Sequence, residues 1–361
     1  MRILYGLCTW GLGHMTRSLP IMRRLIEDGN ELFLYTSDRP LIALKEEFGD
    51  KCKYIESVEY PNPYTKNGTF GLRITLMMPA IINAIIKEHK EIRELSKELD
   101  IDVLISDSEY GVFDKEKPSF FLFHQLRYVP PDFLKILRNQ TERFNYFFRN
   151  SFTKFIVPDF LHDDGLTGNL SHNLSYLSPD TIKYIGILSD YETLNIKEDI
   201  DYLISLSGRE PNRTILEKRI IEQIHDLNGN IVLVRGMPEG ADNLKIPGVE
   251  VINYAGKGLR DEIMNRSKFI IARSGYSTIM DMVELGKKGL LIPTPGQTEQ
   301  EYLSEFLMEK RYFYSVTEAD LSLNKDIALA KNFKGYKPSW KTEESVDKFM
   351  NLLRDTVGGA I

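Results

Sequence analysis

Residues 270–286, with the sequence IIARSGYSTIMDMVELG, constrain the fold more than any other stretch of this chain. A short apolar strand ends in the small turn Arg273-Ser274-Gly275, and from about Ser277 the apolar residues recur at helical spacing. A strand, a turn of small residues and a helix bring free backbone N–H groups and the positive end of the helix to one point. This arrangement suits a phosphate group.

Asp281 lies eight residues beyond Arg273, in the first turns of the expected helix. A carboxylate at this position cannot bind phosphate, but it can accept hydrogen bonds from the hydroxyl groups of a ribose. The segment therefore offers an anion site and a diol site at the spacing of a nucleotide. A plain strand-to-helix turn with a solvated Asp281 fits the same residues, because an isolated glycine turn is a weak signal.

The N-terminal stretch shows the same rhythm, with a strand expected over residues 2–7, a helix over 16–28 and a strand over 31–37. This strand–helix–strand opening predicts a parallel sheet. Gly11 and Gly13 stand in the first loop, but they do not complete the G-x-G-x-x-G pattern of dinucleotide-binding sites. An NAD-dependent oxidoreductase is therefore the weaker interpretation.

His14 stands where this glycine-containing loop enters the helix. Ligands of open α/β sheets bind beyond the carboxyl ends of the strands, so a side chain at this position is expected to face the ligand. Histidine exchanges a proton near neutral pH and is a common general base. A histidine that only caps or packs its own helix is the alternative.

The buried strand expected over residues 101–107 ends in Asp107, which we interpret as a carboxylate that orients His14. A serine on each side of Asp107 allows the alternative that these residues only terminate the strand. His124 follows another expected strand, over residues 119–125, and is a weaker catalytic candidate because its neighbours in the sheet cannot be read from sequence.

A chain of 361 residues exceeds what one hydrophobic core usually serves, so two domains are expected. We predict an α/β protein with two Rossmann-like βαβ domains that face each other across a cleft, where ligands commonly bind. The first domain is expected over residues 1–188 and the second over 200–340. A final helix in residues 341–361 either ends the second domain or crosses back to the first.

Composition narrows the function. A net charge of −6 argues against a general nucleic-acid-binding protein. The two cysteines provide no disulfide framework, and the N-terminus has no signal-peptide pattern, so we expect a cytoplasmic protein. Residues 127–149 carry five basic and two acidic residues among aromatic ones, which suits contact with anionic lipid at the inner face of the membrane. An amphipathic helix packed on the sheet fits the same stretch.

The segment RSGYSTIMDMVELGKKGLLIPTPGQTEQEYLSEFL resembles the nucleotide-sugar-binding signature of GT-B glycosyltransferases of the family 28 C-terminal-domain type. The motif GLGHMTRS resembles the glycine-rich first loop of the same family, which includes MurG and diacylglycerol galactosyltransferases. The resemblance covers roughly residues 1–320. It implies an inverting, metal-independent transfer of a sugar from a nucleoside-diphosphate sugar, with uridine as the expected base. The acceptor would be a glycan or a lipid-linked hydroxyl, and no cofactor besides the donor substrate is implied.

The resemblance also assigns roles to individual residues. Ser274 and Gly275 would bind the diphosphate through backbone N–H groups, Arg273 would brace the turn or the phosphates, and Asp281 would bind the ribose. His14 would lie near the acceptor and the reaction centre. The other residues assigned to binding are Ser207 and Gly208 for the diphosphate, Tyr254 for the base, Gln297 and Gln300 for the sugar or ribose, and Gly11 and Gly13 for close approach of the backbone to substrate.

Three positions depart from the family pattern. The first loop reads G-L-G-H without a doubled glycine, Asp281 replaces the usual glutamate, and Tyr302 stands near the position of an expected asparagine. These departures leave the donor sugar and the acceptor open. A non-hydrolysing UDP-sugar 2-epimerase and a non-catalytic nucleotide-sugar-binding protein are the alternative functions.

Overall fold

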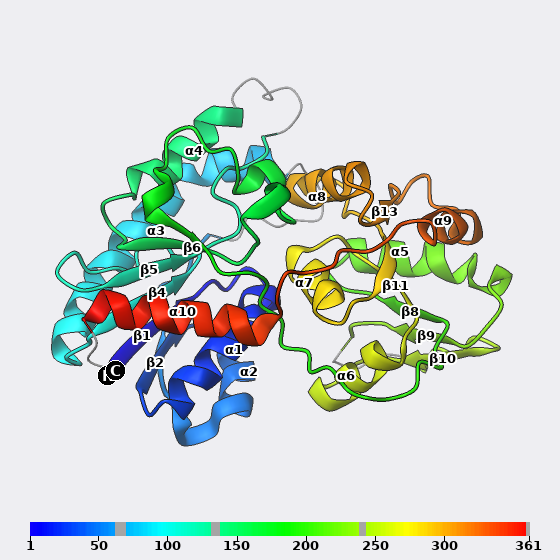
Figure 1. The fold of residues 1–361 in the computed structure, drawn as a ribbon, viewed down its shortest axis with the longest axis horizontal. Helices are drawn as coiled ribbons and strands as arrows, with labels where there is room; N and C mark the ends of the chain where they lie inside the picture. Colours follow the sequence, from blue (N-terminus) through cyan, green and yellow to red (C-terminus); the bar gives the residue numbers. More distant parts are fainter. Residues whose placement is uncertain (62–69, 131–137, 238–242, 359–361) are drawn as a thin grey trace. The chain divides into compact units, whose positions relative to one another are not determined.

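The computed structural model describes residues 1–61, 70–130, 138–237 and 243–358. The chain forms two compact units, each with its own parallel sheet. The first unit comprises Met1–Asp190 and Ser339–Ile361, and the second comprises Tyr191–Pro338. Figure 1 shows both units as sheets covered by helices.

The sheet of the first unit has, within the described ranges, seven parallel strands in the order β3-β2-β1-β4-β5-β6-β7. The strands are β1 (Arg2–Leu7), β2 (Glu31–Thr36), β3 (Lys53–Glu56), β4 (Val103–Asp107), β5 (Ser119–Leu122), β6 (Lys154–Val157) and β7 (Ile182–Tyr184). Leu7 pairs with Asp107, and Asp107 pairs with Leu122, so β1, β4 and β5 end at one edge of the sheet. Asp107 at the end of β4, the loop that leads from β1 to His14, and the segment after β5 that carries His124 therefore start at the same edge of the sheet.

Helices cover both faces of this sheet. They are α1 (Leu12–Glu27), α2 (Asp38–Phe48), α3 (Phe70–Glu98), α4 (Arg138–Phe147) and α10 (Thr342–Val357). Alternate residues of β1 enter different cores: Ile3 and Tyr5 pack in one cluster, while Leu4 packs in another. This period of two is what a strand covered on both faces requires.

The last helix, α10, belongs to the first unit although it lies at the end of the sequence. Its buried residues include Val346, Phe349 and Leu353, which recur at the spacing of one helix face and join the core that contains α1. The Nη1 of Arg24 on α1 donates to Asp347 at 2.9 Å. Figure 1 shows α10 in red beside the blue α1.

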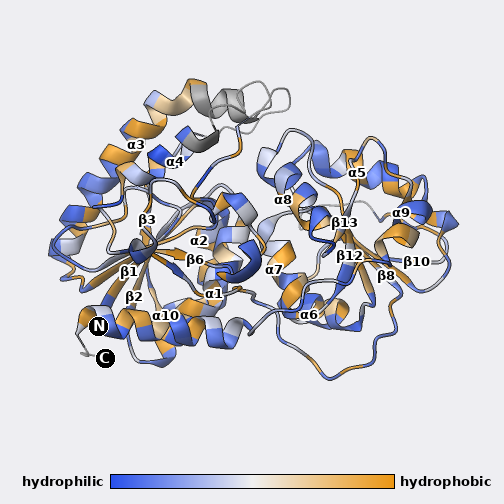
Figure 2. Cartoon of the chain, turned by 45° about the horizontal axis from the view of Figure 1, so that its top comes forward, coloured by the Kyte–Doolittle hydropathy of each residue, from blue (hydrophilic) through white to orange (hydrophobic). Residues whose placement is uncertain are grey.

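The second unit has a sheet of six parallel strands among its described residues, in the order β10-β9-β8-β11-β12-β13. The strands are β8 (Tyr202–Ser205), β9 (Ile231–Val234), β10 (Val249–Ile252), β11 (Phe269–Ala272), β12 (Lys288–Leu291) and β13 (Tyr314–Ser315). The helices are α5 (Asn212–Ile221), α6 (Lys257–Arg266), α7 (Tyr276–Glu284), α8 (Thr298–Glu309) and α9 (Leu323–Ala330). Figure 2 shows hydrophobic residues concentrated on the strands of both sheets.

The predicted α/β class with parallel sheets is confirmed. Between α2 and α3, Lys53–Glu56 form the edge strand β3, and residues 62–69 lie outside the described ones. Of the basic, aromatic stretch 127–149, Arg138–Phe147 form α4, and residues 131–137 lie outside the described part. No described helix is both long and apolar enough to cross a bilayer.

Candidate active site

His14 lies in the first turn of α1, just beyond the end of β1. The backbone N–H of Cys8 donates to the carbonyl of Asp107 at 3.1 Å, which extends the pairing of β1 and β4 by one residue. The helix then begins after Gly11, where an added Cβ would meet only open space. The side chain of His14 is 23% exposed, and its Nδ1 lies 2.8 Å from Oδ1 of Asp107. The structure thus brings the two predicted residues into direct contact.

The carboxylate of Asp107 is fully buried and receives several hydrogen bonds besides that of His14. Arg17 donates through Nε to Oδ2 at 2.9 Å and through Nη2 to Oδ1. Ser18 donates to Oδ2 at 2.8 Å, and Ser108 donates to Oδ1 at 3.0 Å. A carboxyl group with this many donors has no position left for a proton of its own.

Electrostatics favour the same ionised state. Burial alone raises the pKa of Asp107, but the Arg17 guanidinium and His14 oppose burial and hold the pKa well below its ordinary value. Asp107 is therefore a permanent anion beneath His14. A carboxylate in this position holds the imidazole in one orientation and stabilises its protonated form.

Arg17 also reaches a second histidine. Its Nη1 lies 2.8 Å from Nδ1 of His124, which is 5% exposed and follows β5. Tyr5 completes the buried polar network by donating to Ser18 at 3.0 Å. The weaker candidate His124 thus belongs to the same cluster as His14, because β4 and β5 are neighbours in the sheet.

Glu109 and Glu88 are two further buried carboxyl groups of the first unit, and Glu109 contacts the first loop. Glu109 accepts hydrogen bonds from Cys8 and from the backbone of Thr9, and burial followed by repulsion from Glu88 and Asp107 raises its pKa. Burial also raises the pKa of Glu88 to about 7, although Tyr60 donates to it at 2.6 Å. Glu109 thus holds the first loop through hydrogen bonds, and both glutamates are easier to protonate than Asp107.

In the second unit, the turn between β11 and α7 has the conformation expected from the sequence. Gly275 is the N-cap of α7, and within the described structure no side chain caps this helix end. The first N–H groups of α7 have no carbonyl partner inside the helix and carry its positive end. The turn therefore offers backbone donors to an anion.

Arg273 lies under this turn and does not extend from it. Its side chain is 2% exposed, and Nη2 donates to Glu318 at 2.5 Å and to the carbonyl of Asn212 at 2.8 Å. Its Nη1 donates to the carbonyl of Pro293 at 3.1 Å. Of the two predicted roles, these contacts are those of a brace that ties the turn to α5 and to the end of β12.

The start of α8 meets the same turn. Ser274 is buried and donates to the carbonyl of Gln300 at 3.0 Å, and the amide Nε2 of Gln300 donates to Gln297 at 2.6 Å. An added Cβ at Gly275 would lie 3.9 Å from that Nε2. The two glutamines predicted to contact the donor therefore lie beside the Ser274-Gly275 turn, while Asp281 is half-buried farther along α7.

The remaining predicted residues lie at the same edge of the second sheet. Ser207 and Gly208 are exposed beyond the end of β8, which pairs with β11, and the φ of 103° at Gly208 favours glycine. Tyr254 is 57% exposed after β10 and lines a cavity of about 150 Å³ together with Val234 and Arg260. This cavity thus lies at the same edge of the sheet as the predicted phosphate turn.

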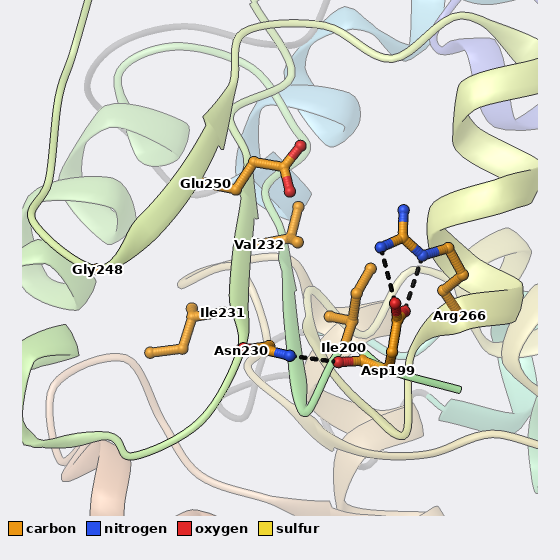
Figure 3. A pocket seen from close by; sticks show the side chains of 8 residues that line it. All are labelled: Asp199, Ile200, Asn230, Ile231, Val232, Gly248, Glu250 and Arg266. Atoms are coloured by element: carbon orange, nitrogen blue, oxygen red, sulfur yellow. Dashed lines mark hydrogen bonds and ion pairs between the residues drawn. The ribbon is translucent and has the colours of Figure 1, made fainter. Parts of the chain in front are cut away.

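A larger hollow of about 250 Å³ lies at the opposite, amino-terminal edge of these strands. Figure 3 shows that Arg266 and Asp199 form an ion pair in it, at 2.8 Å, and that Asn230 donates to the backbone of Asp199. Ligands of parallel α/β sheets bind at the carboxyl edge, so the smaller cavity beside Tyr254 is the better candidate for the base.

Comparison with known families bears on both units. The sequence profile of the glycosyltransferase family 28 C-terminal domain matches residues 212–348, and that of glycosyl transferase family 1 matches residues 1–145. The chain is a glycosyltransferase with a family 28 C-terminal domain.

Relatives and solved structures agree with this assignment. The glycosyltransferase is 26% identical over 340 residues to an uncharacterized glycosyltransferase of Methanosarcina mazei, over 86% of this chain and 84% of the relative. A stretch of 119 residues, 30% of this chain and 33% of the relative, is 28% identical to the UDP-N-acetylglucosamine--N-acetylmuramyl-(pentapeptide) pyrophosphoryl-undecaprenol N-acetylglucosamine transferase of Lachnospira eligens.

The solved structures show the fold. The kitacinnamycin glycosyltransferase superposes with a TM-score of 0.62 at 13% identity, over 99% of this chain and 96% of that one. MurG of Acinetobacter baumannii superposes with a TM-score of 0.58 at 12% identity, over 97% of this chain and 99% of that one. The glycosyltransferase therefore has the GT-B fold, as the resemblance predicted.

Sequence reasoning missed two parts of the site in this glycosyltransferase. Arg17 and Ser18 follow His14 by three and four residues, which places all three on one face of α1, and this spacing is a signal that could have found them. Ser108 was interpreted only as an end to the strand, whereas its hydroxyl bonds to the carboxylate of Asp107. Within the described ranges, no group of three or more His, Cys, Asp or Glu side chains has a metal-binding arrangement.

Proposed function

We propose that this glycosyltransferase moves a sugar from a UDP-sugar to a hydroxyl group of a lipid-linked acceptor, by direct displacement and with inversion of the anomeric carbon. The observation that carries the proposal is the contact between His14 and the buried, ionised Asp107. This pair supplies a base for the acceptor hydroxyl, and the family 28 domain supplies the groups for the donor.

The chemistry needs one proton transfer and one displacement. Asp107 accepts a hydrogen bond from Nδ1 of His14, which leaves the Nε2 lone pair to take the proton of the acceptor hydroxyl. The acceptor oxygen forms a bond to the anomeric carbon while the bond from that carbon to the diphosphate oxygen breaks. The electron pair of the broken bond leaves with the nucleoside diphosphate.

The leaving group would be stabilised by the second unit. Backbone N–H groups at Ser274 and Gly275, with the positive end of α7, would bind the diphosphate. Asp281 would bind the ribose, and the cavity beside Tyr254 would hold the base. In this proposal the reaction uses no metal ion and no cofactor, since a helix end and backbone donors balance the developing charge.

A surface of the first unit supports a lipid-linked acceptor and a location at the cytoplasmic face of a membrane. Leu76, Ile82 and Ile86 on α3 are 72%, 45% and 62% exposed, and Phe147 on α4 is 76% exposed. Figures 1 and 2 show α3 beside α4, and both helices contribute to one aromatic core. Arg143 and Lys87 are also exposed on these helices. Exposed apolar side chains on two neighbouring helices that also carry exposed cations suit an anionic bilayer, and the name of the Lachnospira eligens relative gives an undecaprenol-linked substrate.

The donor assignment is tested by thermal unfolding with a panel of sugar nucleotides, since a ligand that binds the folded state raises the midpoint by mass action. We expect UDP-sugars to raise it more than other nucleotide sugars do. Turnover of the best binder in EDTA, followed by NMR of the product anomer, then tests inversion and metal independence. A retained anomer, or activity abolished by EDTA and restored by a divalent metal, contradicts the mechanism. A donor converted to its epimer without acceptor supports the epimerase instead.

The membrane assignment is tested by co-sedimentation with vesicles that contain anionic lipid. The double variant Ile86→Ser and Phe147→Ser is expected to bind at least about tenfold more weakly, because two apolar side chains no longer enter the lipid. Ile42→Ser is the matched control, since Ile42 is 61% exposed on α2. Equal binding by the double variant and the control excludes this surface as the membrane contact.

A further inference from the structure

We propose that Arg17 is a positioning residue that sets opposite tautomers in the two histidines of the site. His14 carries its neutral-state proton on Nδ1, and His124 carries its own on Nε2. The consequence for catalysis rests on the proposed function, in which Nε2 of His14 is the base, but the tautomers themselves are measurable without turnover.

Arg17 is placed to act on both rings. It lies one helical turn after His14 on α1, and its side chain is 3% exposed. Its nitrogens contact Asp107, Ser108 and both histidines. A guanidinium is planar and rigid, so these contacts are set together by one side chain.

The tautomer of His124 follows from the chemistry of the contact. A guanidinium has only N–H donors and no acceptor, and Nη1 of Arg17 lies 2.8 Å from Nδ1 of His124. Nδ1 of His124 must therefore be the accepting nitrogen. The proton of the neutral ring then resides on Nε2.

The tautomer of His14 follows from a competition at its Nδ1. This atom lies 2.8 Å from Oδ1 of Asp107, an acceptor, 3.0 Å from Nη2 of Arg17, a donor, and 3.2 Å from the hydroxyl of Ser108, which can donate or accept. The two N–H groups of Nη2 have other acceptors, namely Oδ1 of Asp107 and the hydroxyl of Ser108 at 3.3 Å. Ser108 in turn donates to Asp107.

One proton arrangement satisfies the named contacts of this cluster except that between Nη2 of Arg17 and Nδ1 of His14, where both nitrogens carry protons that point to other acceptors. Arg17 donates to Asp107, Ser108 and His124, both serines donate to Asp107, and His14 donates its Nδ1 proton to Asp107. Any arrangement with a bare Nδ1 on His14 places its lone pair against the anionic oxygen. Arg17 thus keeps Asp107 ionised and directs the proton of His14 away from the nitrogen that acts as base.

Without Arg17 this arrangement of protons is lost. Asp107 would lose its guanidinium partner, and Nδ1 of His124 would lose the donor that keeps it unprotonated. Without the guanidinium, the buried Asp107 takes up a proton more readily, and a protonated Asp107 donates to Nδ1 of His14. The proton of the neutral His14 ring then resides on Nε2, which leaves no lone pair there for the proton of the acceptor hydroxyl. We expect kcat to fall about 10- to 100-fold, while the KM for the donor changes little. The reason is that a His14 ring with its proton on Nε2 cannot act as the base, which slows only the chemical step.

The test is two-bond ¹H–¹⁵N NMR of the protein labelled with ¹⁵N-histidine, at a pH where both rings are neutral. Signals are assigned with the variants His14→Gln and His124→Gln. The wild-type spectrum is expected to show Nδ1–H for His14 and Nε2–H for His124. The same tautomer in both rings overturns the proposal.

Variants sharpen the test. Arg17→Met is expected to change the tautomers of both histidines. Arg17→Lys keeps the positive charge without the planar guanidinium, so Asp107 is expected to stay ionised while the tautomer of His124 is no longer fixed. Arg24→Met on the same helix is the control, since Arg24 pairs with Asp28 and Asp347 at the surface. Unchanged histidine signals in a folded Arg17→Met protein also overturn the proposal. Full activity of His14→Ala would instead remove the proposed function and leave the tautomer assignment standing.

Discussion

The two candidate binding edges of this glycosyltransferase are built in different ways. At the first sheet, the chemistry lies in side chains: a buried carboxylate, a buried guanidinium and two imidazoles bond to one another. At the second sheet, the donors are backbone N–H groups at the start of α7. The charged side chain of Arg273 is buried beneath this segment and pairs with Glu318.

This difference predicts how each edge responds to substitution. In the side-chain cluster each group forms hydrogen bonds with several others, so the loss of one group leaves its buried partners without hydrogen bonds. At the backbone turn, a changed side chain leaves the N–H donors in place. We therefore expect large effects in the first unit and graded, smaller ones in the second.

The largest effect is expected for His14→Ala. Loss of a general base lowers kcat by about 10²- to 10⁴-fold, and the fold should survive because this side chain is partly exposed. The measurement is kcat with a donor and acceptor identified as above. His162→Ala, an exposed histidine of the same unit, is the control. A rate close to wild type would exclude His14 as the base.

Asp107→Asn is expected to lower the free energy of unfolding by about 3 kcal/mol at neutral pH, because Arg17 stays buried without its counter-charge. The effect has a definite pH dependence. Since the pKa of Asp107 is lowered in the folded protein, its contribution is present above the unfolded value of about 4 and is lost as pH falls below it.

Urea unfolding across acidic pH measures this contribution. The difference in the free energy of unfolding between wild type and Asp107→Asn should become smaller as the pH drops below about 4. The exposed Asp180, changed to Asn, provides the matched control. A difference that stays constant below pH 4 would mean that folding does not lower the pKa of Asp107.

At the second sheet, Asp281→Ala is expected to weaken donor binding about 10- to 100-fold, the value of hydrogen bonds to a charged group, while bound donor reacts at a similar rate. Calorimetric titration of the donor gives the affinity, and single-turnover kinetics give the rate. Asp320→Ala, a surface carboxylate of the same unit, is the control. Unchanged affinity would reject the ribose assignment.

The smallest effect is expected for Ser274→Ala. The hydroxyl of Ser274 bonds to the carbonyl of Gln300, so its loss removes one structural hydrogen bond of about 1 kcal/mol and no contact to the donor. Donor affinity should change less than about fivefold. A loss as large as that of Asp281→Ala would show that the side chain itself binds the diphosphate, which would weaken the contrast between the two edges.

The predicted parts of the site are those that follow from local patterns. His14 was identified because a loop that enters a helix after a strand lies at the carboxyl edge, and Asp107 because it ends a strand. The turn at Ser274-Gly275 was identified from its small residues between a strand and a helix. In each case the relevant neighbours lie within a few residues in the chain.

Arg17 and His124 were not understood from sequence, because their roles depend on which strands are adjacent. His124 meets Arg17 only because β5 lies next to β4, and the order of parallel strands is not encoded in local spacing. Arg273 was expected to face either the turn or the phosphates, and only its contacts with Glu318 and the Pro293 carbonyl show that it faces inward.

The sequence by itself determined the α/β class, the parallel strands, the strand-to-helix turns and the family resemblance, since periodicity and turn chemistry act over short distances. Tertiary structure decided the strand order, the placement of α10 on the first unit and the direction of each buried charge. The physical reason is that a buried ion takes its partner from whatever packing brings near, and for Asp107 the guanidinium comes from a helix 90 residues away in the chain.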